Sequence, residues 1–259
     1  MTSTSFIGQL QAILTTLGDS QDEALDRAAD SMASSIAGDR LVHLYGSGHS
    51  VIPVMDSFPR YGSFVGLNPL TDPRLMWWNV LGPGGVRPLL WLERTEGYAE
   101  QYLSTQPIRE RDTMIVFSHG GRNAAPVEAA VYARDRGVRV VGVTSMANTR
   151  RPAGHSSGKR LADVSDIVID TGVPVEDALI TLDGWPAPLA GGSTVVACVV
   201  VGELISRTAA KLLERGITMP TFVSPTVPGA SVETNDHVFD AFGRRLLQAE
   251  EQEAAALAE

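Results

Sequence analysis

The sequence predicts an α/β fold in which helices cover both faces of a mainly parallel sheet. Short apolar runs alternate with longer stretches of helical periodicity from residue 39 onward. The runs at 41–45 and 113–117 are almost continuously apolar, which is typical of strands buried on both faces. The chain has 259 residues, of which 44% are hydrophobic, enough for one large core. We therefore expect a single domain over 1–259, with a helical segment at 1–38 and an α/β core at 39–259.

The order of the elements follows from the spacing of the apolar residues and from the glycines, prolines and capping residues between them. Apolar residues at helical spacing predict two helices within 5–37, interrupted near Gly18 and closed by Gly38. Ser50 is placed to cap a short helix starting at Val51. Residues 60–92, rich in Trp, Pro and Gly, predict an irregular excursion. Strands are expected at 41–45, 113–117, 138–143 and 167–170, and further helices at 96–105, 124–136, 193–215 and 236–258.

Composition and charge exclude several classes of protein. The net charge is −9, whereas nucleic-acid binders usually carry a basic face. The N-terminus lacks the pattern of a signal peptide, and the apolar run at 195–201 is far shorter than the roughly 20 residues that span a bilayer. A single cysteine, Cys198, suits a reducing compartment. We expect a cytoplasmic protein that binds neither nucleic acid nor membrane.

Two glycine-rich loops each leave a predicted strand and enter a predicted helix. They are Gly46–Ser50 and Ser118–Asn123. Glycines such as Gly48 let backbone amides approach a ligand, the following helix supplies a positive end, and Arg122 can add a charge-assisted contact. Thr144 ends the next strand at the same edge. The loops therefore predict an anion site built from neutral donors, although ordinary tight turns remain an alternative reading.

Three other motifs compete with this interpretation. Gly46 and Gly48 begin a dinucleotide fingerprint, but Val51 stands where its third glycine belongs. Residues 154–158 match the Gly-x-Ser-x-Gly elbow of serine hydrolases, with Asp177 or Asp183 and His237 as triad partners. The elbow requires a strand before it, and the sequence there predicts none. The five histidines show no metal-ligand spacing, so we expect no metal and no cofactor. His43 lies inside a strand, where a hydrogen-bonded core histidine is the simplest expectation.

Taken together, the loops resemble the SIS (sugar isomerase) domain family, whose members bind phosphosugars. The likeness spans nearly the whole chain. Besides the two loops, it rests on Glu93-Arg94-x-Glu96-Gly97-Tyr98-Ala99, His155-x-Ser157-Gly158-Lys159, Ile167–Asp170, Asp177-Ala178, Ser193-Thr194 and Leu212–Gly216. It implies a three-layer sandwich with a five-stranded, mainly parallel sheet of flavodoxin-like or Rossmann-like topology. It also implies a homodimer with sites near the subunit interface.

The resemblance further implies a phosphorylated sugar as ligand and an aldose–ketose isomerase as activity. The residues that it places around the phosphate are Ser47, Ser50, Ser118, Gly121, Asn123, Ser193 and Thr194. The sequence departs from the family pattern at Gly120, where a serine is usual. It also departs at Val51, Met55 and Asp56, where a histidine and paired glutamates are usual. These departures leave open a non-catalytic phosphosugar sensor.

Isomerisation moves a proton between adjacent carbons, which a carboxylate and a histidine can do without a cofactor. The candidate bases are Glu93, then Glu96, then Asp56. Glu93 and Glu96 follow an apolar stretch containing Trp91, and such a wall raises a carboxyl pKa toward neutrality. His49 or His155 would open the sugar ring. Lys159 would contact the anion or the sugar hydroxyls. Each carboxylate could equally be a surface charge or half of an ion pair.

Overall fold

The computed structural model describes residues 5–256, and its centre is a five-stranded parallel sheet with the order β2-β1-β3-β4-β5. The strands are β1 (Val42–Gly46), β2 (Leu67–Leu70), β3 (Thr113–Phe117), β4 (Arg139–Thr144) and β5 (Ile167–Asp170). This is the flavodoxin-like order, in which the chain changes direction across the sheet between β1 and β3. The expected α/β fold with a parallel sheet is confirmed.

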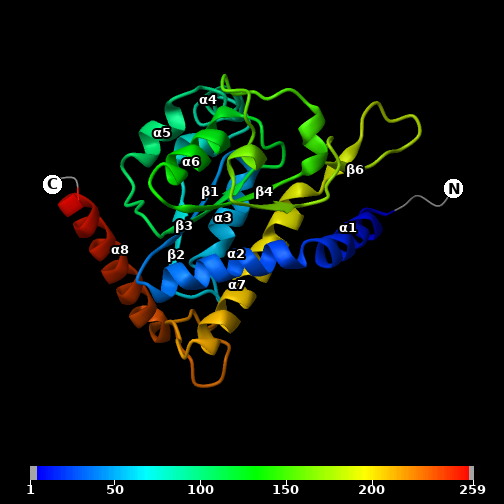
Figure 1. Cartoon of the computed structure of the whole chain (residues 1–259). Coiled ribbons are helices and arrows are strands. Elements are labelled where there is room, and N and C mark those ends of the chain that lie inside the picture. The colour runs from blue at the N-terminus through cyan, green and yellow to red at the C-terminus, as the bar shows by residue number, and fades with distance from the viewer. Residues whose placement is uncertain (1–4, 257–259) are drawn as a thin grey trace.

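Helices cover both faces of the sheet (Figure 1). On one face lie α1 (Phe6–Ser20), α2 (Asp22–Ala37), α3 (Val51–Ser57) and α7 (Ser193–Glu214). On the other lie α4 (Val86–Leu92), α5 (Tyr98–Leu103) and α6 (Ala124–Arg134). The final helix, α8 (Asp236–Ala256), runs along the side of the molecule to the C-terminus (Figure 1). Of the two expected N-terminal helices, α2 packs on the sheet, whereas α1 packs mainly against α2 and the segment Ala178–Ile180.

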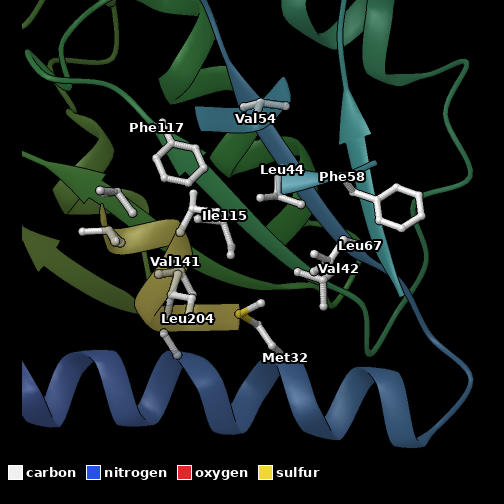
Figure 2. Close-up of a cluster of buried hydrophobic side chains, with 14 of the residues drawn as sticks. Met32, Val42, Leu44, Val54, Phe58, Leu67, Ile115, Phe117, Val141 and Leu204 are labelled. Carbon is white, nitrogen blue, oxygen red and sulfur yellow. The ribbon is translucent and has the colours of Figure 1, made fainter. Parts of the chain in front are cut away.

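The strand side chains alternate between two buried clusters. Figure 2 shows Val42, Leu44, Ile115 and Phe117 in the cluster that packs against the helices, with Met32 of α2 and Leu204 of α7 beside them. The intervening side chains of β3, Met114 and Val116, point into the second cluster. Helices cover both faces of the sheet and exclude water from them, so nearly every strand position is apolar. That is why short, nearly continuous apolar runs located β1, β3, β4 and β5 in the sequence.

Several elements differ from the sequence expectations. The break between the N-terminal helices falls at Gln21, so Gly18 lies inside α1, and helix α4 ends the segment that was expected to be irregular. The segment 60–92 contains the edge strand β2, which was not predicted because Pro69 lies within it. Proline is tolerated there because only one side of an edge strand is paired. A short antiparallel hairpin of β6 (Ala178–Ile180) and β7 (Leu189–Gly191) was not expected. The predicted helix 236–258 is present, although residues 257–259 lie outside the described part.

None of the helices within residues 5–256 is both long enough and apolar enough to cross a membrane.

Candidate functional site

The two glycine-rich loops lie side by side at the carboxyl edge of the sheet. β1 and β3 are parallel neighbours, and Gly46 is paired with Phe117 at their ends. Residues 46–50 and 118–123 therefore leave the sheet next to each other. Gly46 is required by the first turn, because a Cβ there would lie 2.2 Å from the carbonyl oxygen of Ser50. This edge, at the switch point of the strand order, is where α/β sheets commonly bind ligands.

Both loops and the start of α7 line one small cavity. Four of the predicted phosphate contacts, Ser50, Ser118, Ser193 and Thr194, are among its lining residues. Ser50 precedes α3, but its side chain makes no capping hydrogen bond, contrary to the sequence expectation. The cavity has a volume of about 10 Å³, which is the space of about one water molecule. A phosphoryl group would therefore need these small side chains to rotate or the loops to spread.

Only part of the backbone around this cavity is free to bind an anion. The amides of His119 and Gly120 have no acceptor among residues 5–256. At α7, in contrast, the amides of Gly192 and Ser193 both donate to the Asp177 carboxylate, at 3.0 and 2.7 Å. The Asp177 carboxylate thus caps the N-terminus of α7, and Ser193 can offer only its hydroxyl.

Glu93 joins the two loops. The residue is 8% exposed. It accepts hydrogen bonds from Ser47 Oγ at 3.0 Å and from Asn123 Nδ2 at 2.9 Å. Burial raises the pKa of Glu93, while the Ser47 hydroxyl opposes that shift. Of the predicted apolar wall, Leu89 is buried, and its side chain and the Glu93 carboxylate both lie about 4 Å from where a Cβ of Gly48 would be. Trp91, in contrast, is 69% exposed, so the expectation that it helps to bury the carboxylate was wrong.

This arrangement gives Ser47 and Asn123 a partner that the sequence analysis did not foresee. Both were expected to contact the phosphate, but their polar groups point to the Glu93 carboxylate. The backbone amide of Ala125 also donates to the Glu93 carbonyl oxygen, at 3.0 Å. The structure therefore favours Ser47 and Asn123 as positioning residues for the carboxylate.

Glu96 is engaged differently from Glu93. It is exposed, and it accepts hydrogen bonds from the amide and the hydroxyl of Ser156, both at 2.6 Å. The hydroxyl and then the amide lower the pKa of Glu96. His155 lies beside it, with Nε2 at 4.0 Å from Glu96 and at 3.7 Å from Glu128. A carboxylate held in its ionised form by donors is a weaker proton acceptor than Glu93, so the geometry favours Glu93 as base.

The two remaining acid–base candidates lie apart from Glu93 or are exposed. Asp56 forms an ion pair with Arg60, one turn further along the chain. It lines a separate cavity of about 460 Å³ with Cys198 of α7. His49 is exposed, and its ring stacks on Trp77 with centroids 4.3 Å apart. Asp56 is therefore disfavoured as a base, whereas His49 remains next to the first loop.

The other predicted contacts fall at the rim or behind the loops. Gly48 and Gly121 adopt left-handed backbone angles, φ 59° and 57°. A Cβ on Gly121 would lie 2.6 Å from Thr144 Oγ1, so Thr144 packs behind the second loop. Arg122 is half-buried and its Nε has no hydrogen-bond partner within residues 5–256. Lys159 is exposed.

The hydrolase interpretation lacks its structural context. The segment 154–158 contains no strand or helix, and neither flanks it directly. Ser156 donates to Glu96 rather than to a histidine. Asp177 caps α7, and His237 lies at the start of α8, bonded to the Thr234 carbonyl oxygen. These groups do not form a triad.

Two cavity residues were missed by the sequence analysis. His119 belongs to the second loop, but its side chain was not singled out. Thr171 directly follows β5, and a polar residue after a strand was the only available signal.

Comparison with known proteins agrees with this architecture. The SIS domain family profile matches residues 5–145. A UPF0309 protein of Streptomyces coelicolor is 35% identical over 236 residues, covering 91% of this chain and 92% of the relative. A UPF0309 protein of Listeria innocua is 32% identical over 235 residues, covering 90% and 93%.

Solved structures show the same fold at low identity. A phosphoheptose isomerase from Neisseria gonorrhoeae matches with a TM-score of 0.52 at 14% identity, covering 79% of this chain and 95% of that one. The phosphoheptose isomerase from Francisella tularensis gives 0.50 at 16% identity, with the same coverage. The family profile spans more than half of the chain, and the UPF0309 relatives span nearly all of it. The chain therefore belongs to the SIS domain family.

Proposed function

We propose that the protein binds a phosphorylated sugar at the carboxyl edge of its sheet and interconverts its aldose and ketose forms. The observation that carries the proposal is the buried Glu93 carboxylate between two hydroxyl-bearing loops, with a raised pKa. The hydroxyls of Ser50, Ser118 and Thr194 would hold the phosphoryl group. The phosphoheptose isomerase activity of the structural neighbours supports the reaction class.

Glu93 would act as the single base of the reaction. It would take the proton from C2 of the open-chain aldose, leaving an enediol, and return it to C1. A second proton passes from O2 to O1, so the atoms balance. A carboxyl pKa raised by burial makes Glu93 a better proton acceptor than a solvated carboxylate. His49 or His155 would open the ring, since neutral imidazole can accept and donate protons near pH 7.

Glu93→Gln tests the role of the base. The amide keeps the size of the side chain but cannot accept the carbon-bound proton. On a panel of hexose, pentose and N-acetylhexosamine phosphates, we expect turnover to fall by about 100-fold or more, with the dissociation constant changed by less than about threefold. Glu100→Gln, at an exposed position of α5, is the matched control and should leave both unchanged. Equal turnover in Glu93→Gln and the parent protein would contradict the proposal.

A non-catalytic phosphosugar sensor is the second candidate. It is favoured by the two hydrogen bonds that Glu93 accepts, one on each carboxylate oxygen, which would also suit a purely structural link between the loops. The placement of Asp56 away from the loops favours it too. Thermal stabilisation by a panel sugar phosphate without turnover would select this candidate. Failure of every sugar phosphate to bind would overturn both.

We also propose that the site lies near the interface of a homodimer. Exposed apolar side chains sit close in sequence to the cavity residues: Ile52 and Met55 on α3, and Val195 at the start of α7, are 38%, 49% and 41% exposed. α3 packs on α7, so these side chains lie on neighbouring helices. Sedimentation should show a dimer in the parent protein and a monomer in Ile52→Asp/Met55→Asp. A monomeric parent protein would contradict this.

A further inference from the structure

One segment beside the carboxyl-edge site is basic, although the protein as a whole is acidic. Residues 136–162 contain no aspartate or glutamate, whereas the 259-residue chain has 30 of them and a net charge of −9. The later part of this segment carries the exposed residues Arg150, Arg151 and Lys159 and the half-buried Arg160. The segment is therefore a local source of positive charge.

This basic segment packs directly on the second loop. The amide of Gly154 donates to the carbonyl oxygen of Arg122, at 2.9 Å, and the amide of Leu161 donates to that of Gly121, at 2.8 Å. Position 154 must be glycine for this approach, because a Cβ there would lie 2.8 Å from the Arg122 carbonyl oxygen. The two hydrogen bonds fix residues 154–161 against the loop that lines the cavity, so the basic segment forms part of the rim of the site.

Arg122 is the cation that lies closest in sequence to the cavity residues of the second loop. Its Cγ and Cδ lie 3.6 and 3.9 Å from where a Cβ of Gly120 would be, so the side chain runs back along the loop. Its Nε is buried and unpaired, and no carboxylate oxygen of residues 5–256 lies within 4.0 Å of its guanidinium. Burying a charge without a partner costs free energy, so half-buried arginines are usually paired. Within the described chain, Arg122 is a half-buried cation that lacks an anionic partner.

The other cations of the rim are also free of ion pairs. Within residues 5–256 no carboxylate oxygen lies within 4.0 Å of the charged nitrogens of Arg150, Arg151, Lys159 or Arg160. Two carboxylates do approach the segment, since Nε2 of His155 lies 4.0 Å from Glu96 and 3.7 Å from Glu128. Both accept hydrogen bonds from backbone amides as well. They hold the segment in place without pairing with its arginines or its lysine.

We propose that the ligand carries, besides its phosphoryl group, a second anionic group, either a carboxylate or another phosphoryl, and that Arg122 binds it through its forked N–H groups. The two anion positions are neighbours, because Ser118 lines the cavity and Arg122 belongs to the same loop. The remaining cations of the rim supply a positive field that attracts the doubly anionic sugar. This inference rests on the proposed function, because it names the substrate class of the same site.

Matched ligands test for the second anionic group. A hexose 6-phosphate, the corresponding hexose 1,6-bisphosphate and the corresponding aldonate 6-phosphate carry the same phosphoryl group and differ at C1. Calorimetry gives the dissociation constant of each. We expect one of the two doubly anionic compounds to bind at least about tenfold more tightly than the monophosphate, because a charge-assisted, bidentate contact is added. The preferred compound identifies the second group as a phosphoryl or a carboxylate.

Arg122→Gln tests the residue that makes this contact. The preference for the doubly anionic ligand should fall below about twofold, while the affinity for the monophosphate changes by less than about threefold. Arg122→Lys keeps the charge but loses the fork, so it should retain a preference of about threefold. Arg27→Gln, at an exposed position of α2, lowers the net charge by the same amount and should keep the full preference. Tm of Arg122→Gln should not fall, because the guanidinium makes no ion pair within residues 5–256.

Salt separates the close contact from the field of the rim. At about 1 M salt the Debye length is only about 3 Å, so exposed charges no longer act at a distance. Lys159→Gln should weaken binding of the doubly anionic ligand about two- to threefold at low ionic strength and have no effect at about 1 M salt. The effect of Arg122→Gln should persist at both.

The outcomes distinguish this inference from the proposed function. Equal affinities of the parent protein for the monophosphate and both doubly anionic compounds would overturn the inference, as would an unchanged preference in Arg122→Gln. The same loss of preference in Arg27→Gln would show unspecific attraction and would also overturn it. In each of these cases binding and turnover of the sugar monophosphate would leave the proposed function standing. If no sugar phosphate binds at all, the proposed function fails, and this inference fails with it.

Discussion

The two edges of the sheet differ in how their buried polar side chains are hydrogen-bonded. At the amino edge, His43 lies between Asp112 and Asn68, with each ring nitrogen 3.0 Å from its partner. Asp112 also accepts from the amides of Leu41 and Arg109. At the carboxyl edge, His119 leaves one ring nitrogen unpaired, and Thr171 leaves its hydroxyl unpaired. The side chains of His43 and Asp112 are fully paired with each other and their neighbours, although Nε of Arg109 beside them has no partner within residues 5–256. At the carboxyl edge, in contrast, the unpaired atoms belong to residues that line a cavity.

The cavities at the two edges also differ in size. A cavity of about 680 Å³ lies at the amino edge, lined in part by Asp112, Arg111 and Arg139. The cavity at the carboxyl edge is far smaller, about 10 Å³. Unpaired buried groups nevertheless accumulate around the smaller one. We infer that the amino edge stabilises the fold and that the carboxyl edge binds the ligand.

Removing the central acceptor of the amino edge should have the largest effect on stability. Asp112→Ala leaves two buried amides and the His43 N–H without their acceptor. We expect the free energy of unfolding to fall by about 3–5 kcal/mol, measured by urea denaturation. Ligand affinity of the folded fraction should stay unchanged. A loss below about 1 kcal/mol in the free energy of unfolding, or a loss of ligand binding by the folded protein, would contradict the assignment of stability to the amino edge and of binding to the carboxyl edge.

A methyl group at the first loop should affect both stability and binding. In Gly46→Ala the added Cβ would clash with the backbone of Ser50. We expect a loss of about 1–3 kcal/mol in unfolding free energy, together with a loss of ligand affinity of at least about tenfold as the loop is displaced. Gly18→Ala is the control: within α1 a Cβ there meets no atom within 4 Å. Gly18→Ala should raise the free energy of unfolding by about 0.5–1 kcal/mol and leave ligand affinity unchanged. Normal affinity in Gly46→Ala would show that the first loop is not part of the site.

The buried carboxylate of the carboxyl edge should respond to pH in the direction set by its raised pKa. Folding favours the protonated form of Glu93, so its contribution to stability is complete below its ordinary value of 4.5 and is lost as pH rises through the raised pKa. Measured against Glu93→Gln, the parent protein should therefore lose relative stability as pH rises above 4.5. Urea denaturation at pH 4 to 8 checks this. A relative gain in stability over that range would contradict burial as the dominant influence.

The smallest expected effect is that of Ser47→Ala. The Ser47 hydroxyl stabilises the ionised Glu93, so its removal should raise the Glu93 pKa further. If Glu93 is the base, the acid limb of the pH–rate profile should move to higher pH. Asn123→Ala should move it in the same direction, since the amide also donates to the carboxylate. A shift toward lower pH would show that another group controls the limb.

The sequence predicted the fold well wherever burial on both faces made the pattern simple. β3 and β5 were placed at their observed ends, because all residues of β3 except Thr113 and all residues of β5 except Asp170 are apolar. The two N-terminal helices and α7 followed from helical spacing. β2 was missed because Pro69 looks like an interruption until the strand is known to lie at the edge. The β6–β7 hairpin is too short and exposed to leave an apolar pattern.

The site was predicted as a pair of loops but not as a network. Strand ends followed by glycine and serine located residues 46–50 and 118–123. The link from Ser47 to Asn123 through Glu93 joins residues 30 and 46 positions apart, which no local pattern reveals. Asp56 was a candidate base because it follows the first loop in the sequence. In the structure its side chain instead forms an ion pair with Arg60. The unpaired groups of His119 and Thr171 are visible only once their neighbours are known.

A crystal structure with the sugar phosphate that stabilises the protein best would show directly whether the carboxyl edge binds the phosphoryl group. We expect the phosphoryl oxygens within about 3.2 Å of the hydroxyls of Ser50, Ser118 and Thr194. The sugar should then extend toward Glu93. A phosphoryl group bound instead in the amino-edge cavity, beside Arg111 and Arg139, would contradict this expectation.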